Sequence, residues 1–387
     1  GTLTFVDELK GQFKKTIVKD DILSCSVIKE EYMRRAIELA KRATGFTNPN
    51  PLVGVVIVKE DRIIGEGYHE KCGQLHAERN AFASLKESAE GATLYVTLEP
   101  CCHYGKTPPC TEAIVENKIA RVVIGSRDPN PLVAGKGVRF LREHGIEVIE
   151  DYLREECDRI NPVFFHYITT KMPYVVLKYA MTADGKTATV TGDSKWITND
   201  ASRMKVQHMR HRYMGIMAGI GTVLADDPML NVRVERLKSP IRIICDSNLR
   251  IPLDSQIVKS ADKYKTIVAC VHTDDEKIAK LQERGVSVEV IPSEREVDMT
   301  CLMQRLGQLG IDSVLVEGGG TLNDSLLQAN LINQVDVFIG SKIFGGAKAK
   351  SPMEGTGIEK VKDAPEFYLD GIERIEDDVL LTYMKRR

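Results

Sequence analysis

Two short segments carry the residue types of a hydrolytic metal site. The first is His76-Ala77-Glu78, and the second begins at Pro100-Cys101 and ends at Cys110, with eight residues between the two cysteines. One imidazole and two thiols supply three ligands to a zinc ion and leave a fourth position open for water. Glu78 fits the remaining role, which is to take a proton from that water and pass it to a leaving group.

A structural zinc site is one alternative. It closes the fourth position with another side chain, and Cys102 or His103 could provide it. A lone His-x-Glu or a pair of cysteines also occurs often without any metal. The remaining cysteines are expected to be structural or exposed thiols: Cys25, Cys72, Cys157, Cys245, Cys270 and Cys301.

Helices and strands are predicted to alternate around these motifs, which indicates a layered α/β domain. His76 and Glu78 can converge only if His76 caps its helix, because residues two apart on a regular helix do not face each other. Cys101 follows a predicted strand and Cys110 precedes a predicted helix, whose N-terminus favours a thiolate. The predicted helices are 31–45, ended by Gly45, then 76–86, 111–117 and 138–144, and the strands are 52–58, 62–65, 93–98, 121–125 and 146–149.

A second alternation begins at Pro173, after a helix and connector over 151–170, and it needs an activity of its own because the zinc motif ends at Cys110. Gly318-Gly319-Gly320 follows a predicted strand and opens a helix, an arrangement that suits phosphate. A Gly-x-Gly-x-x-Gly motif after a first strand is missing, so a Rossmann domain is not supported. The predicted strands are 174–179, 215–218, 241–245, 266–271, 286–291, 313–317 and 335–339, and the helices are 200–212, 275–284, 299–309 and 322–329.

Composition limits the partners. The chain has 387 residues, which favours more than one domain, and we expect an N-terminal extension of unknown role at 1–27, a first domain at 28–171 and a second at 172–387. A net charge of −2 gives no electrostatic footprint for nucleic acid, and no apolar run approaches the roughly 20 residues of a membrane span. Nine cysteines without an export signal favour reduced thiols in the cytoplasm. We expect a homo-oligomer acting on small molecules.

Several polar residues of the first half are candidate substrate contacts. The Asn50 amide could match a pyrimidine edge, and Lys106, Asp128 and Asn130 could bind ribose and phosphate, although Asn50, Asp128 and Asn130 could equally cap turns. This half of the chain also contains Thr47-x-Pro-Asn-Pro-x-Val-Gly54, the long Cys101–Cys110 insertion with Gly-Lys-Thr-Pro-Pro, and Arg127-Asp-Pro-Asn-Pro131. Through these segments it resembles the bacterial bifunctional riboflavin-biosynthesis deaminase/reductases. The resemblance implies zinc ligands His76, Cys101 and Cys110, proton shuttle Glu78, and phosphoribosyl-pyrimidine contacts Asn50, His69, Lys106, Asp128 and Asn130. Cys102 replaces the usual serine.

The second half resembles the reductase half of the same family through Lys178–Lys186, Thr191–Thr198 and Gly219–Pro228. The resemblance implies a dihydrofolate-reductase-like α/β fold that uses NADPH, beside a cytidine-deaminase-like α/β/α domain. We expect Lys178 and Glu317 to polarise the ribose C1 and supply a proton. Implied cofactor contacts are Ala180, Trp196, Thr222, Asp226, Gly319, Gly320, Thr321, Leu322, Asn323, Asp324 and Ser325, and implied substrate contacts are Ser194, Arg210, Leu230, Arg233 and Glu317. Arg210 and Arg233 suit a phosphate, because a guanidinium binds it bidentately.

The implied reactions are hydrolytic deamination of a diaminopyrimidinone ribosyl phosphate and reduction of its ribosyl group to ribityl by NADPH. Two other functions stay open at this stage. One is a deaminase for a free nucleoside or tRNA fused to an unrelated module, although a tRNA enzyme would need a basic, aromatic-lined surface. The other is a binding protein stapled by zinc, with no catalysis.

Overall fold

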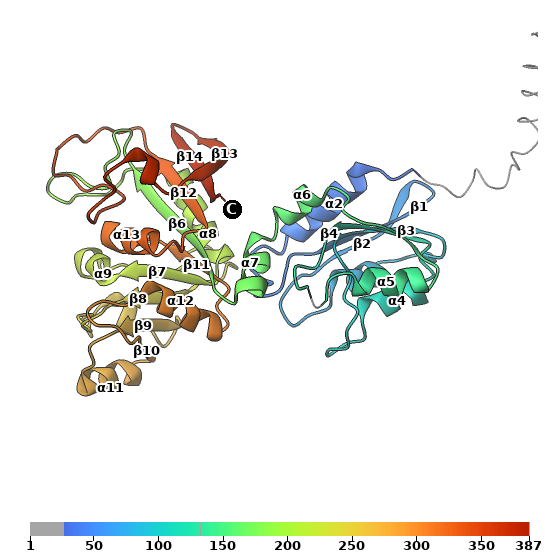
Figure 1. Cartoon of the computed structure of the whole chain (residues 1–387), viewed down its shortest axis with the longest axis horizontal. Coiled ribbons are helices and arrows are strands. Elements are labelled where there is room, and N and C mark those ends of the chain that lie inside the picture. Colours follow the sequence, from blue (N-terminus) through green and yellow to red (C-terminus); the bar gives the residue numbers. More distant parts are fainter. Residues whose placement is uncertain (1–26, 132, 387) are drawn as a thin grey trace, which may run out of the picture. The chain divides into compact units, whose positions relative to one another are not determined.

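The computed structural model describes residues 27–131 and 133–386, so the predicted extension at 1–27 lies almost wholly outside the described residues. Contacts divide the chain into two compact units (Figure 1). The N-terminal unit runs to Ala43 and resumes at Leu52–Ile160, whereas the C-terminal unit combines Thr44–Pro51 with the chain from Asn161 onward. Each unit has its own sheet.

The sheet of the N-terminal unit has the strand order β2-β1-β3-β4-β5, with β1 antiparallel to β2 and β3 and the remaining pairs parallel. Apolar side chains of alternate strand residues pack against α2 and α6 on one face and against α3, α4 and α5 on the other. This is the predicted α/β/α layering. The elements are α2 Glu30–Lys41, β1 Gly54–Lys59, β2 Arg62–Tyr68, α3 Ala77–Ala83, β3 Thr93–Leu98, α4 Cys110–Glu116, β4 Arg121–Ser126, α5 Lys136–Glu143, β5 Glu147–Ile149 and α6 Arg154–Asp158.

Gly45 was predicted to end the first helix, but α2 already ends at Lys41. The glycine is required for another reason. Its φ is +87°, and a Cβ atom there would lie 2.4 Å from Nε2 of His211. Segment 44–51 is held in the C-terminal unit, where His211 bonds the Thr44 carbonyl at 3.0 Å and Asn48 donates to Asp312 at 2.8 Å.

The sheet of the C-terminal unit has the order β10-β9-β8-β7-β11-β6-β12-β14-β13. The first seven strands in this order, from β10 through β12, are parallel to one another. Strands β14 and β13 extend the sheet in antiparallel pairing. The elements are α7 Pro162–Thr170, β6 Tyr174–Met181, α8 Asp200–Arg212, β7 Gly215–Gly219, α9 Ile220–Asp226, β8 Ile241–Cys245, α10 Gln256–Lys259, β9 Thr266–Cys270, α11 Asp275–Glu283, β10 Val286–Val290, α12 Met299–Gln308, β11 Ser313–Val316, α13 Gly320–Gln328, β12 Gln334–Ile339, η1 Val361–Asp363, β13 Phe367–Ile375 and β14 Asp378–Lys385.

The core of this unit lies on both faces of the parallel strands. Helices α12 and α13 cover one face, and α8, α9, α10 and α11 cover the other. Strands β7, β11 and β6 are neighbours and parallel, so their carboxyl ends meet at one edge, where such sheets place ligands. Gly219 ends β7 and Glu317 directly follows β11, while Lys178 lies within β6, one residue beyond Leu177, which pairs with Val316 at the end of β11.

Candidate zinc and reductase sites

His76, Cys101 and Cys110 come together in the N-terminal unit. Their ligand atoms all lie within 4.8 Å of one another, with Nδ1 of His76 3.3 Å from the Cys110 sulfur and 3.6 Å from the Cys101 sulfur. One nitrogen and two sulfurs at this spacing fit zinc. Among the described residues, neither Cys102 nor His103 joins the cluster. The donor set therefore has the three-ligand form of a catalytic zinc site.

Local structure explains the convergence. His76 is the N-cap residue of α3, with extended backbone angles, as the sequence argument required. Cys101 follows β3, and Cys110 is the first residue of α4, where its backbone N–H donates to the Cys101 sulfur at 3.2 Å. These contacts favour a thiolate, because hydrogen bonding from Cys110 outweighs burial and lowers the pKa of Cys101. The hydrogen bond with Cys101 and burial raise the pKa of Cys110. A divalent cation between the two sulfurs would relieve the repulsion between two thiolates.

Glu78 points into this cluster from the first turn of α3. The residue is only 4% exposed, and burial followed by the Cys101 thiolate raises the pKa of its carboxyl. His69 is buried beside the cluster, with its ring edge-on to His76 at 5.8 Å and Nδ1 3.0 Å from the Leu75 carbonyl. The exposed side of the cluster lies at His76, whereas Cys110 is buried. A substrate can therefore reach the ligands from the His76 side.

The other predicted contacts of this half lie in loops. Lys106 is exposed in the loop between Cys101 and Cys110. Asp128 accepts from the backbone N–H of Asn130 at 2.9 Å, so its carboxylate has at least a turn-capping role. The Asn50 backbone N–H bonds the Thr47 carbonyl at 2.8 Å, in the segment that groups with the C-terminal unit. The substrate-binding roles of Asn50, Lys106, Asp128 and Asn130 stay predictions.

The C-terminal unit brings together three charged residues that are far apart in the sequence. Glu317 accepts from Nζ of Lys178 at 2.8 Å and from Nε of Arg210 at 2.6 Å. The Glu317 side chain is 6% exposed, and Lys178 and Arg210 are each 14% exposed. Arg210 also donates Nη1 to the Asn231 carbonyl at 2.9 Å. In this arrangement the guanidinium is an internal partner of Glu317.

The surroundings of Glu317 favour its ionised form. Burial alone would raise the pKa of this carboxyl, but the charges of Arg210 and Lys178 outweigh it and lower the pKa to about 2. An ionised carboxylate has no proton to give. Lys178, whose ammonium carries three N–H groups, is therefore the donor candidate of the pair.

The low pKa of Glu317 makes a prediction about stability. A depressed pKa stabilises the fold above the ordinary value of 4.5, and this contribution is lost as the pH falls toward about 2. The difference in unfolding free energy between the wild type and Glu317→Gln should be constant from pH 7 to 5 and shrink below. Urea titrations followed by fluorescence of Trp196, the single tryptophan, measure it. A difference that already shrinks between pH 7 and 6 contradicts the assignment.

The predicted cofactor contacts lie mostly at the ends of β6, β7 and β11. Gly319 is the N-cap of α13, and Gly320–Ser325 form its first turns. Thr222, in α9, faces this turn, since a Cβ on Gly319 would lie 3.6 Å from its Oγ1. Trp196 is 54% exposed, with the Arg203 guanidinium 4.4 Å from its ring centroid. The remaining cofactor contacts, Ala180 and Asp226, lie in β6 and at the end of α9. The predicted substrate contacts lie in the segments before α8 (Ser194) and after α9 (Leu230, Arg233).

Sequence reasoning missed a helix, a residue and a pair of strands in the C-terminal unit. Helix α9 begins directly after β7 with Gly219 as N-cap, which places a second helix N-terminus beside that of α13. The glycines of Gly219-Ile-Gly221 were the available signal. Asn231 was not singled out, although it bonds Arg210 and Tyr264 and its Oδ1 is buried without a hydrogen-bond partner. No sequence expectation covered the β13–β14 pair.

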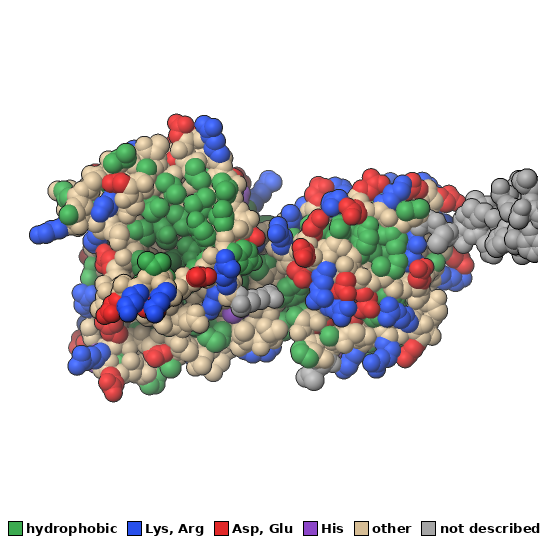
Figure 2. Space-filling view, turned by 45° about the horizontal axis from the view of Figure 1, so that its top comes forward, with side chains coloured by type: hydrophobic (Ala, Val, Ile, Leu, Met, Phe, Trp, Pro, Cys, Tyr) green, Lys and Arg blue, Asp and Glu red, His purple; other side chains and the backbone are tan. Residues whose placement is uncertain are grey.

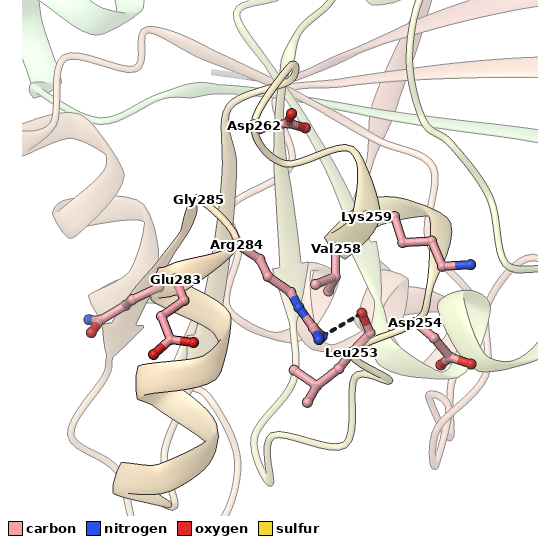
Figure 3. Close-up of a pocket in the computed structure, with 9 residues that line it drawn as sticks. Leu253, Asp254, Val258, Lys259, Asp262, Glu283, Arg284 and Gly285 are labelled. Atoms are coloured by element: carbon pink, nitrogen blue, oxygen red, sulfur yellow. Dashed lines mark hydrogen bonds between the residues drawn. The ribbon is translucent and has the colours of Figure 1, made fainter.

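A separate surface hollow of 660 Å³ lies between α10 and the end of α11 (Figure 3). Its charged side chains have both signs, including Lys259, Arg284, Asp254 and Glu283, and Arg284 donates to the Leu253 carbonyl at 2.9 Å. None of its lining residues is among the predicted site residues. This hollow is not part of either candidate site.

Fold and site together define a protein with a zinc-dependent deaminase unit and a parallel-sheet reductase unit. Residues 26–126 match the cytidine and deoxycytidylate deaminase zinc-binding region, and residues 173–381 match the RibD C-terminal domain. The chain is 54% identical over 355 residues to the riboflavin biosynthesis protein RibD of Actinobacillus pleuropneumoniae, covering 92% of this chain and 94% of that protein. The chain belongs to the RibD family of bifunctional riboflavin-biosynthesis enzymes.

Solved structures agree with this assignment. A structure of Acinetobacter baumannii RibD has a TM-score of 0.83 and 39% identity, covering 92% of this chain and 99% of that one. A Thermotoga maritima deaminase/reductase has a TM-score of 0.82 and 40% identity, covering 92% and 98%. The predicted family, fold class and pair of activities are confirmed, and so are a zinc-binding deaminase domain and a reductase domain that uses a nicotinamide cofactor. A nucleoside or tRNA deaminase with an unrelated module, or a protein without catalysis, is excluded.

Proposed function

We propose that the N-terminal unit deaminates 2,5-diamino-6-(5-phosphoribosylamino)pyrimidin-4(3H)-one and that the C-terminal unit reduces the ribosyl group of 5-amino-6-(5-phosphoribosylamino)uracil with NADPH. The Thermotoga relative is described as the enzyme of these two steps. The single observation that carries the proposal is the His76, Cys101 and Cys110 cluster with Glu78 buried against it. The proposed boundaries are 28–171 for the deaminase and 172–387 for the reductase. The reductase match, which begins at residue 173, supports the start of the second domain, although contacts group residues 161–171 with the C-terminal unit.

In the deaminase, zinc bound by His76, Cys101 and Cys110 would supply an activated water at neutral pH. Glu78 then accepts the proton of the attacking water and delivers it to the departing amine. Its carboxyl is suited to this exchange because burial raises its pKa and makes the protonated form accessible. His69 and Asn50, with Lys106, Asp128 and Asn130, are the proposed substrate contacts.

In the reductase, the cofactor would supply a hydride to C1 of the ribosyl group. Lys178 donates a hydrogen bond and a proton to the oxygen released at that carbon, and Glu317 holds the Lys178 ammonium in place at 2.8 Å. The proposed substrate contacts are Ser194, Arg210, Leu230, Arg233 and Glu317. The proposed cofactor contacts are Ala180, Trp196, Thr222, Asp226 and Gly319–Ser325.

The surface supports small-molecule partners. Over the N-terminal unit, acidic and basic side chains alternate on the face seen in Figure 2, where a nucleic-acid-binding surface would be uniformly basic. Within residues 27–131 and 133–386, every helix is too short or too polar to traverse a bilayer. Leu369 and Ile372 of β13 are 47% and 69% exposed, and such apolar side chains favour the proposed homo-oligomer. The eight described cysteines lie outside disulfide bonds, which fits the proposed cytoplasmic location.

Removal of zinc tests the division of labour. Treatment with a strong chelator should abolish ammonia release from the diaminopyrimidine substrate, because the protein ligands alone cannot activate water. Reduction of the deaminated substrate by NADPH should continue at the same rate. Adding zinc back should restore ammonia release. Deamination that survives complete loss of the metal contradicts the proposed mechanism.

A further inference from the structure

Arg242, the second residue of β8, has a cationic side chain inside the core of the C-terminal unit. Its exposed fraction is 0%, and it is the largest of the fully buried side chains. Within residues 27–131 and 133–386, the partners of its guanidinium are carbonyl and hydroxyl oxygens, with no carboxylate among them. A buried charge is costly unless its hydrogen bonds are satisfied, so the role of Arg242 must lie in those bonds.

The guanidinium of Arg242 joins three segments of the chain. Nε and Nη2 donate to Oγ1 of Thr266, the first residue of β9, at 3.1 and 2.9 Å. Nη2 also donates to the Ile257 carbonyl of α10 at 2.7 Å, and Nη1 donates to Oγ of Ser260, which ends that helix, at 2.9 Å. The third segment is the one that follows α9, where Nη1 donates to the Met229 carbonyl at 3.0 Å.

Met229 opens residues 229–233, which we call the substrate loop because it contains the proposed substrate contacts Leu230 and Arg233. Leu230 has a φ of +51°, a left-handed conformation that a leucine adopts only where its surroundings hold it. The next carbonyl, that of Asn231, accepts from Nη1 of Arg210 at 2.9 Å. The shape of the loop is therefore fixed by bonds to arginines on either side of Leu230.

Tyr264 secures the same loop from the segment before β9. Its hydroxyl accepts from the side-chain amide of Asn231 at 3.2 Å, and the guanidinium of Arg242 lies 5.3 Å from the centroid of its ring. The Tyr264 carbonyl also accepts from Oγ1 of Thr266 at 2.8 Å, the same oxygen that Arg242 binds. Arg242 and Tyr264 thus form one connected group beneath the substrate loop.

We propose that Arg242 and Tyr264 are positioning residues of the reductase, which hold the substrate loop in the conformation that binds the phosphorylated substrate. The inference rests on the proposed function of the C-terminal unit. The planar guanidinium suits this role, because it offers five N–H groups in fixed directions, whereas a lysine ammonium is a single point charge. Both residues act through Leu230 and Arg233, so their loss should weaken substrate binding rather than slow the chemical step.

The first test is the Arg242→Lys variant of the full-length, zinc-loaded protein. Its KM for 5-amino-6-(5-phosphoribosylamino)uracil should rise about tenfold or more, the effect of losing one hydrogen bond to a charged group. Its turnover number should stay within about threefold of the wild type, because binding that is equal in the ground and transition states affects KM alone. The dissociation constant for NADP⁺, measured by calorimetry, should be unchanged, since the proposed cofactor contacts lie outside the substrate loop.

Two further variants separate positioning from a general loss of stability. Ile243→Ala destabilises the core from the opposite face of β8 and leaves the bonds of Arg242 in place, so its KM should equal that of the wild type. Tyr264→Phe removes only a hydroxyl from a partly exposed ring, so it should fold even if Arg242→Lys does not. Its KM should rise about threefold, the effect of one neutral hydrogen bond.

An unchanged KM in Tyr264→Phe or in folded Arg242→Lys, or an equal rise in Ile243→Ala, overturns the proposal. Wild-type protein that does not oxidise NADPH with this uracil would instead refute the proposed function, and the inference with it. Normal wild-type turnover together with an unchanged KM in the variants would refute the positioning role alone and leave the proposed function intact.

Discussion

Glu78→Gln should release ammonia roughly 10²- to 10⁴-fold more slowly than the wild type, the range that general acid–base catalysis contributes. Gln keeps the shape of the side chain but cannot accept a proton from water and return it to the amine. The metal ligands are untouched, so zinc content should stay at one equivalent. Stopped-time ammonia assays together with metal analysis measure both quantities.

Glu116→Gln is the matched control for that variant, because Glu116 is an exposed carboxylate of α4 in the same unit. It should deaminate at the wild-type rate. NADPH-dependent reduction should be unchanged in both variants. If Glu78→Gln retained turnover within a fewfold of the wild type, Glu78 would not be the proton shuttle, and loss of zinc from the variant would make it a structural residue instead.

Lys178→Met should lower the turnover number of the reductase by a similar factor, roughly 10²- to 10⁴-fold, because the proton donor is removed. The fold should tolerate the change, since Arg210 still pairs with Glu317 through Nε at 2.6 Å and Nη2 at 3.3 Å. Binding of NADPH should persist. Stopped-flow absorbance of NADPH, with the deaminated substrate in excess, gives the rate.

Lys205→Met provides the control, because Lys205 lies on α8 and pairs with Glu373 rather than with Glu317. It should reduce substrate at the wild-type rate. Ammonia release should be normal in both lysine variants. A wild-type turnover number for Lys178→Met would assign the proton to another group, and a changed KM alone would limit Lys178 to substrate binding.

The zinc site could be predicted from the sequence because its residues occur in short segments with a recognisable spacing. His76 and Glu78 are two residues apart at a helix start, and Cys101 and Cys110 flank a turn between a strand and a helix. Short-range geometry of this kind follows from element boundaries. The alternation of helices and strands likewise indicated both layered units, since buried parallel strands are continuous apolar runs.

The reductase site could be predicted only in part. The identities of Lys178, Arg210 and Glu317 came from a resemblance, but their mutual ion pairs depend on β6 and β11 being neighbours in the sheet. Spacing along the chain does not contain that information. Because the pairs were not foreseen, the sequence did not indicate that Arg210 and Lys178 lower the pKa of Glu317 to about 2, so the division of roles between Lys178 and Glu317 stays a prediction.

Segment 44–51 has a consequence for any attempt to produce the two units separately. The chain leaves the N-terminal unit after Ala43 and returns to it at Leu52, while the intervening residues are bonded by His211 and Asp312. A single cut between the two units would therefore leave residues 44–51 in the N-terminal half, although their contacts group them with the C-terminal unit. A C-terminal half produced separately would lack this segment, and His211 and Asp312 would lose the partners that they have here.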